Sequence, residues 1–153
     1  MSANLREDAE VLQLGLRAGV LSTADVVRWA DRVLAEHPVA AGPFFELAVA
    51  TPALGAARLS TLLGDVPGRA EPVAVGRRFL GLLLAWYDRQ PTAGPQIARM
   101  LGGLATDGLL ASEEFGAEPY FLDEYFTEPF YTRNEAGEEL RAYLQAHSSA
   151  PAV

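Results

Sequence analysis

The chain has 153 residues, half of them hydrophobic, with no cysteine and a formal net charge of −8. This length and apolar content fit one domain with a sizeable core, and the lack of cysteine excludes a disulfide scaffold, a thiolate metal site and a thiol nucleophile. The charged start, MSANLREDAE, lacks the apolar run of a secretion signal, and the longest apolar run, FLGLLLAWY, is far shorter than the roughly twenty residues of a membrane helix, so we expect a cytoplasmic protein without membrane association.

Helical patterns open the chain. Residues 4–18 place leucine and alanine at spacings of three and four, which is one face of a helix. Ser22 followed by Asp25 has the spacing of a capping box and predicts the start of a second helix. That helix is expected to end near His37, because Pro38 disfavours helical geometry in the residue before it.

Helices are also expected in the middle of the chain. Residues 43–50 predict a short helix or turn, and Thr51 with Pro52 provides an N-cap and a favoured first position for the next helix. Residues 71–89 are apolar almost all round the helix cylinder, so this helix is expected at the centre of the fold. Another helix runs from the Pro/Gly-rich stretch before Ile97 toward Gly108.

The C-terminal part predicts two more helices, a short one bounded by Pro119 and Pro129 and a last one that begins near Asn134. No stretch alternates polar and apolar residues as a strand does. The predicted fold is therefore all-α, an irregular single-domain bundle of six to eight helices over residues 1–147, with a flexible tail at 148–153. A short stack of helical repeats is the alternative.

Candidate catalytic residues have simpler structural roles. His37 lies where an imidazole stabilises a helix C-terminus, His147 is expected on the exposed surface, and Ser22 is expected to cap a helix. The two histidines do not form a known zinc or di-iron motif, and adjacent carboxylates on a helix point about 100° apart. The sequence thus predicts a protein that is not an enzyme and has no metal or cofactor. A helical enzyme, with Glu46 meeting Trp86 or Tyr87 in a pocket, is kept as a third alternative.

The segment EEFGAEPYFLDEYFTEPFY, residues 113–131, is unusual in composition. It contains six carboxylates and seven aromatic rings, and no basic residue. From Glu113 to Glu139 nine acids stand against one base, so this window has the whole net charge of the chain. A nucleic-acid ligand is not expected, because phosphate binding needs a basic surface, whereas a basic protein is the natural complement.

The aromatic rings of this segment have two expected uses. Some pack on the bundle, as the stripe of Phe121, Leu122, Tyr125 and Phe126 indicates. The tyrosines interleaved with carboxylates have the composition of a protein-binding surface. The predicted partner-binding residues are Glu118, Tyr120, Asp123, Glu124, Tyr125, Glu128 and Tyr131. The alternative is a helical scaffold or regulatory protein with a solvated acidic face.

Two stretches, GLRAGVLSTADVVRWADRVLAEHP and FLDEYFTEPFYTRNEAGEELRAYLQAH, resemble small acidic helical bacterial proteins of the toxin-immunity type. Those proteins pair a V-S/T-x-x-D/E-V-x-x-W-A-D-like second helix with a late acidic segment and a final E-E-L-R-x-Y-L-like helix. The resemblance implies a stoichiometric inhibitor of a cognate toxin, often a nuclease with a basic active-site cleft. It implies toxin contacts at Asp123, Glu124 and Tyr125, and it does not extend to residues 40–112.

Overall fold

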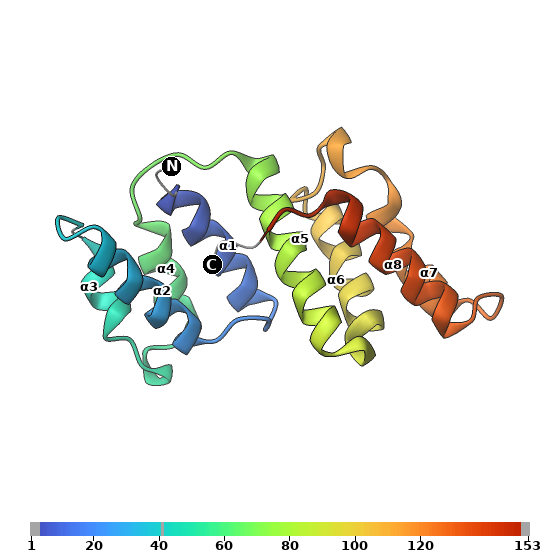
Figure 1. The fold of residues 1–153 in the computed structure, drawn as a ribbon, viewed down its shortest axis with the longest axis horizontal. Coiled ribbons are helices and arrows are strands. Elements are labelled where there is room, and N and C mark those ends of the chain that lie inside the picture. Colours follow the sequence, from blue (N-terminus) through green and yellow to red (C-terminus); the bar gives the residue numbers. More distant parts are fainter. Residues whose placement is uncertain (1–3, 41, 151–153) are drawn as a thin grey trace. The chain divides into compact units, whose positions relative to one another are not determined.

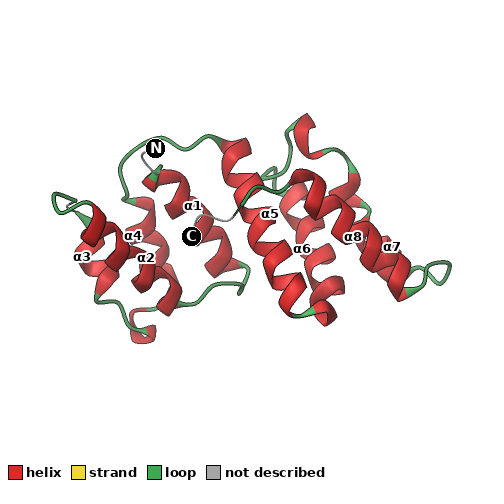
Figure 2. Cartoon of the chain, viewed as in Figure 1, coloured by secondary structure: helices red, strands yellow, loops and turns green. Residues whose placement is uncertain are grey.

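The computed structural model describes residues 4–40 and 42–150, which form eight α-helices and four short 3-10 helices and contain no strand (Figures 1 and 2). The predicted all-α bundle of six to eight helices is therefore confirmed. Contacts divide the chain into two compact units that meet in sequence at Glu71 and Pro72. The single domain over residues 1–147 stays a prediction.

The first unit contains four α-helices, coloured blue to green in Figure 1: α1 (Leu5–Arg17), α2 (Thr23–Glu36), α3 (Pro43–Ala48) and α4 (Ala56–Gly64). Helix α1 packs on α4, and α3 packs on both α2 and α4. The helices enclose a core of apolar side chains that includes Leu12, Trp29, Val33, Phe44, Leu47, Leu59 and Leu63. The apolar spacing of α1 and α2 in the sequence matches the faces that they bury.

The ends of α2 lie where the sequence predicts them. The Asp25 carboxylate accepts a hydrogen bond from the backbone N–H of Ser22 at 2.7 Å, which is half of the capping box. His37 is the C-cap, and its N–H donates to the Val33 carbonyl oxygen at 2.8 Å. The helix predicted from Pro52 onward differs from the structure: Pro52 opens the short 3-10 helix η1 (Pro52–Leu54), and Gly55, at φ +86°, breaks the helix before α4.

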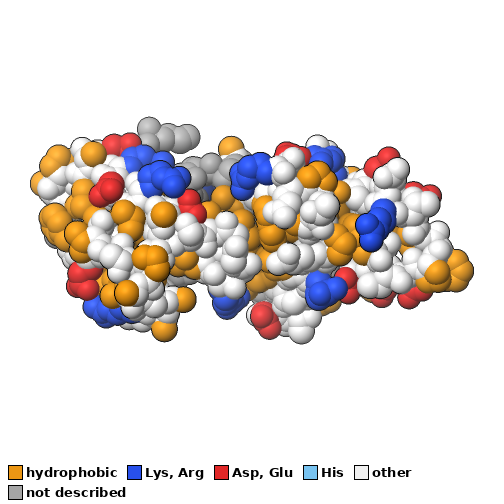
Figure 3. All heavy atoms as spheres, turned by 90° about the horizontal axis from the view of Figure 1, so that it is seen from below, with side chains coloured by type: hydrophobic (Ala, Val, Ile, Leu, Met, Phe, Trp, Pro, Cys, Tyr) orange, Lys and Arg blue, Asp and Glu red, His pale blue; other side chains and the backbone are white. Residues whose placement is uncertain are grey.

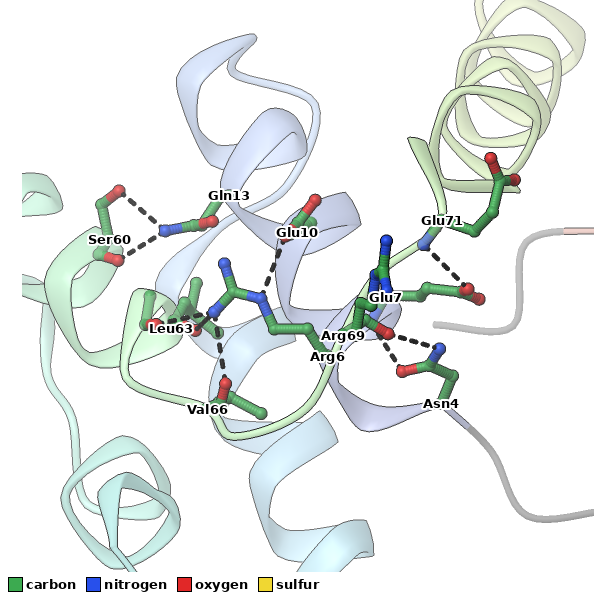
Figure 4. Close-up of polar contacts among 11 residues, drawn as sticks. Asn4, Arg6, Glu7, Glu10, Gln13, Ser60, Leu63, Val66, Arg69 and Glu71 are labelled. Carbon is green, nitrogen blue, oxygen red and sulfur yellow. Dashed lines mark hydrogen bonds and ion pairs between the residues drawn. The ribbon is translucent and has the colours of Figure 1, made fainter. Parts of the chain in front are cut away.

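Polar side chains of α1 hold the end of α4 and the loop that follows it (Figure 4). The Arg6 Nη1 donates to three carbonyl oxygens there, those of Leu63 at 3.3 Å, Gly64 at 2.6 Å and Val66 at 3.2 Å. The last carbonyls of a helix have no partner within the helix, and this guanidinium supplies a donor to two of them, those of Leu63 and Gly64. Farther along α1, Gln13 Nε2 donates to the Ser60 carbonyl oxygen at 2.7 Å.

The second unit contains α5 (Pro72–Arg89), α6 (Gly94–Thr106), α7 (Leu122–Thr127) and α8 (Arg133–His147), with the 3-10 helices η2 (Pro91–Ala93), η3 (Glu113–Phe115) and η4 (Glu118–Tyr120) between them. Helix α5 contacts α6 and α8 within this unit, and α7 contacts α6 and α8. Its buried side chains include Phe79, Leu80, Leu83, Ile97, Leu101, Phe115, Leu122, Leu140 and Leu144.

Helix α8 begins within one residue of its predicted start. Thr132 and Glu135 form a capping box: the Thr132 N–H donates to the Glu135 carboxylate at 2.7 Å, and the Glu135 N–H donates to the Thr132 hydroxyl at 3.2 Å. These hydrogen bonds lower the pKa of Glu135, the backbone one most. In the predicted tail, the Ser149 N–H donates to the Arg77 carbonyl oxygen at 3.0 Å, and residues 151–153 lie outside the described residues.

Within residues 4–40 and 42–150, no helix is both long and apolar enough to cross a membrane.

Candidate partner-binding site

The acidic segment 113–131 folds as three short helices, η3, η4 and α7, joined by tight turns. Gly116, at φ +66°, makes the turn after η3, in a conformation that suits glycine. Phe115 just before it is 1% exposed, and its ring lies so close to Gly76 of α5 that a Cβ there would come within 2.5 Å. The segment is thus fixed to the second unit by a buried ring.

Two polar contacts fix the same part of the segment. The Tyr143 hydroxyl of α8 donates to the Phe115 carbonyl oxygen at 2.9 Å in a buried position. Arg77 of α5 forms an ion pair with Glu114. One carboxylate of the segment is thus paired with a basic residue from outside the segment, which itself contains none. The N-terminal part of the segment is therefore structural, and residues 118–131 contain all the predicted binding residues.

The seven rings divide between core and surface. Phe115 is buried, and Tyr125 and Phe126 are half-buried on α7. The Phe126 ring lies 3.2 Å from where a Cβ on Gly94 would be, so this ring packs on the start of α6. The other four rings are exposed: Tyr120 at 50%, Phe121 at 51%, Phe130 at 85% and Tyr131 at 45%. Phe121 was predicted in the docking stripe with Leu122 but faces solvent, since the 3-10 turn before α7 shifts the helical phase.

The predicted tyrosines are partly exposed and also make contacts within the fold. The Tyr120 hydroxyl donates to the Ala105 carbonyl oxygen at 3.1 Å, which fixes a ring that is half exposed. The rings of Tyr125 and Tyr131 pack at a centroid distance of 4.7 Å and an interplanar angle of 59°. This pair joins α7 to the turn that precedes α8, and it brings two predicted binding residues together.

The predicted carboxylates differ in their environment. Glu118, Glu124 and Glu128 are exposed. Asp123 is half-buried, and its Oδ1 is buried with no hydrogen-bond partner among the described residues. Three of the four predicted acids are thus accessible to a partner. Figure 3 shows hydrophobic and acidic side chains next to one another at the end of the second unit where α7 and α8 meet.

A pocket of about 600 Å³ lies between η4, α7 and α8. It brings together two predicted binding residues, Glu118 and Tyr125, and three residues of α8 that were not predicted to bind, Glu139, Tyr143 and His147. The α8 residues are spaced by four and therefore lie on one helix face, a signal that is visible in the sequence. His147 was expected on the exposed surface but is half-buried, with its ring 4.5 Å from that of Tyr143.

Carboxylates make the pocket electrostatically negative. The Glu139 carboxylate raises the pKa of Tyr125 most, and burial, Tyr131, Glu118 and Glu124 raise it further. Burial is the main cause of the raised pKa of Tyr143, and Glu118 adds to it. Tyr125 thus holds its proton more tightly mainly because a second negative charge beside Glu139 would be unfavourable, and Tyr143 does so mainly because its hydroxyl is buried. The pocket therefore suits a cationic group.

Residues of the alternative enzyme hypothesis have other partners. Glu46 of α3 forms an ion pair with Arg58 at 2.9 Å in the first unit. Tyr87 of α5, in the second unit, is buried, and the Arg141 guanidinium lies 4.8 Å from its ring centroid. Among the described residues, no group of three or more histidine, aspartate or glutamate side chains could hold a metal ion.

Comparison with known protein families, with curated proteins and with solved structures finds no match for this chain.

Proposed function

We propose that the chain is a non-enzymatic protein-binding module of the bacterial cytoplasm, an immunity-like inhibitor that binds a basic toxin or nuclease through residues 118–131. The observation that supports this most directly is the exposure of four aromatic rings, in Tyr120, Phe121, Phe130 and Tyr131, beside exposed carboxylates. Exposed rings next to polar residues are the usual composition of a protein interface.

The anchoring of the segment adds to this argument. Phe115 and Leu122 are buried, and the Tyr120 hydroxyl is bonded to α6. The exposed rings are thus presented by a fixed backbone, and a partner would meet a surface that loses little conformational entropy on binding. Glu124 of α7 and Glu128, its C-cap, are exposed and would steer a basic partner toward the segment.

The test is capture of the partner from a lysate of the source bacterium, with the tagged wild-type chain and a variant that combines Asp123→Asn, Glu124→Gln and Glu128→Gln. We expect the wild type to retain a basic protein that high salt releases, because salt screens exposed charges. We expect the variant to lose that protein. The retained protein is then assayed for toxic or nuclease activity and for its inhibition by the wild-type chain.

The matched control neutralises three exposed carboxylates of the first unit, with Asp31→Asn, Glu36→Gln and Asp65→Asn. It changes the net charge by the same amount and should retain the partner. Equal capture by the wild type and by the variant at 123, 124 and 128 would instead favour the scaffold alternative. The ion pair between Glu114 and Arg77 fits that alternative, since it uses one acidic residue within the fold.

A further inference from the structure

The pocket between η4, α7 and α8 has a lining that combines rings with carboxylates. Tyr125 and Phe121 come from one side, and Tyr143 comes from α8. Glu118 and Glu139 contribute a carboxylate from each side. Ala142 and Ala146 also line it, and their short side chains leave the space open along α8.

Neither carboxylate of the pocket is neutralised within the fold. Glu118 and Glu139 have no ion-pair partner among the described residues, and both are exposed. Arg141, the nearest arginine along α8, is bound to Asp88 of α5. His147 also lines the pocket, and its ring packs on that of Tyr143 at a centroid distance of 4.5 Å and an interplanar angle of 36°.

We infer that this pocket receives the guanidinium of an arginine side chain of the basic partner. A guanidinium is planar and stacks on tyrosine and phenylalanine rings, and it is hydrated more weakly than an ammonium. It also has five N–H donors, enough to reach carboxylates on both sides of the pocket. An arginine therefore matches the rings and both carboxylates, whereas a lysine ammonium lacks the planar shape and has three donors instead of five.

This inference rests on the proposed function, because the arginine belongs to the same partner, and it adds Glu139 to the binding residues. It also means that the arginine of the partner would contact η4 and α7 on one side of the pocket and α8 on the other. The predicted surface residues Glu124 and Glu128 would then guide the partner to the surface, and the pocket would hold one of its side chains.

The test is a titration of the full chain, followed by NMR of its backbone amides, with N-acetyl-arginine methylamide, N-acetyl-lysine methylamide and N-acetyl-citrulline methylamide. We expect saturable shifts of the η4, α7 and α8 amides with the arginine probe, and weaker binding of the lysine probe. The citrulline probe has the same shape without the charge and should not bind. Equal shifts with citrulline, or arginine shifts spread over all acidic surfaces, would overturn the inference.

Single variants give a second measurement. Glu139→Gln and Glu118→Gln should each weaken binding of the arginine probe about two- to fivefold, the range of one exposed ion pair. The control is Glu138→Gln, an exposed neighbour that does not line the pocket, and it should leave the affinity unchanged. Equal weakening by Glu138→Gln and Glu139→Gln would show general charge attraction and overturn the inference.

The two proposals fail in different ways. If the arginine probe does not bind but partner capture still depends on Glu124 and Glu128, the pocket inference is wrong and the proposed function stands. If the probe binds the pocket and no basic protein is captured, the pocket chemistry is right and the proposed function is wrong.

Discussion

At the scale of single residues, Tyr143 connects the core of the second unit to the candidate site. Its ring is 5% exposed, its hydroxyl is bonded to the Phe115 carbonyl oxygen, and one side of it lines the pocket. Burial raises its pKa above the ordinary value of 10.0. A group whose pKa is raised by folding stabilises the fold fully below its unfolded pKa, and this stabilisation is lost as pH rises through the folded pKa.

This predicts alkaline destabilisation to which two side chains contribute, Tyr143 through its burial and Tyr125 through the carboxylate of Glu139. All twelve basic residues are arginine, so tyrosines are the side chains that titrate between pH 9 and 12. Above pH 10 the free energy of unfolding should fall by up to about 1.4 kcal/mol per pH unit for a tyrosine that stays protonated in the fold. In Tyr143→Phe the fall should be shallower. Urea unfolding between pH 8 and 12 measures it.

The same variant has an effect at neutral pH. Tyr143→Phe leaves the buried Phe115 carbonyl oxygen without this donor, which should cost about 1 kcal/mol. The control is Tyr120→Phe, which removes the hydroxyl of a half-exposed ring and should keep the alkaline slope. If Tyr143→Phe declined as steeply as the wild type, the buried hydroxyl would not be a source of the alkaline destabilisation.

At the scale of elements, the acidic segment depends on a close approach between η3 and α5. Gly76→Ala would place a Cβ 2.5 Å from the Phe115 ring, so the ring or the helix must shift. We expect the variant to lose about 1–3 kcal/mol of unfolding free energy, the usual cost of overpacking a core. The control is Gly103→Ala on α6, where a Cβ meets nothing within 4 Å and alanine should stabilise the helix by up to about 1 kcal/mol.

Thermal or urea unfolding of both variants checks this prediction. A Gly76→Ala variant as stable as Gly103→Ala would contradict the buried position of Phe115. If the segment loosens as expected, the exposed rings lose their fixed backbone as well, and partner capture should weaken in Gly76→Ala without any change of charge.

The same elements show what local sequence can predict. The helices at 5–17, 23–36 and 133–147 were predicted within about two residues, because apolar spacing and capping residues are local signals. The break at Gly55 was missed, since Thr51 and Pro52 also suit the start of a continuous helix.

The candidate site was predicted in part for a similar reason. Composition pointed to residues 113–131, which are local in sequence, and four of the seven rings there are exposed. The pocket was not predicted, because Glu139 and His147 meet Glu118 only through the packing of α8 on α7. The spacing of four along α8 marks a face, but it does not tell which element that face meets.

At the scale of the whole molecule, each of the two units has its own buried core. In each unit, a single substitution can disrupt one contact and leave the residues of the other unit unchanged. In the first unit, Arg6→Ala removes the donors to three carbonyl oxygens at the end of α4 and should cost about 1–3 kcal/mol. Arg17→Ala, an exposed arginine of the same helix, is its control. In the second unit, Gly76→Ala displaces Phe115.

Hydrogen exchange measured along the chain by mass spectrometry should distinguish these variants. A unit with its own core opens as its own cooperative element. Arg6→Ala should therefore speed exchange in α1 to α4 and leave α5 to α8 unchanged, and Gly76→Ala should do the reverse. If either variant instead speeds exchange in both units by the same factor, the chain unfolds as the single domain that its length and composition predicted. A confined response would mean that the partner-binding surface is stabilised by the second unit alone, and that changes in the first unit leave partner affinity as it is.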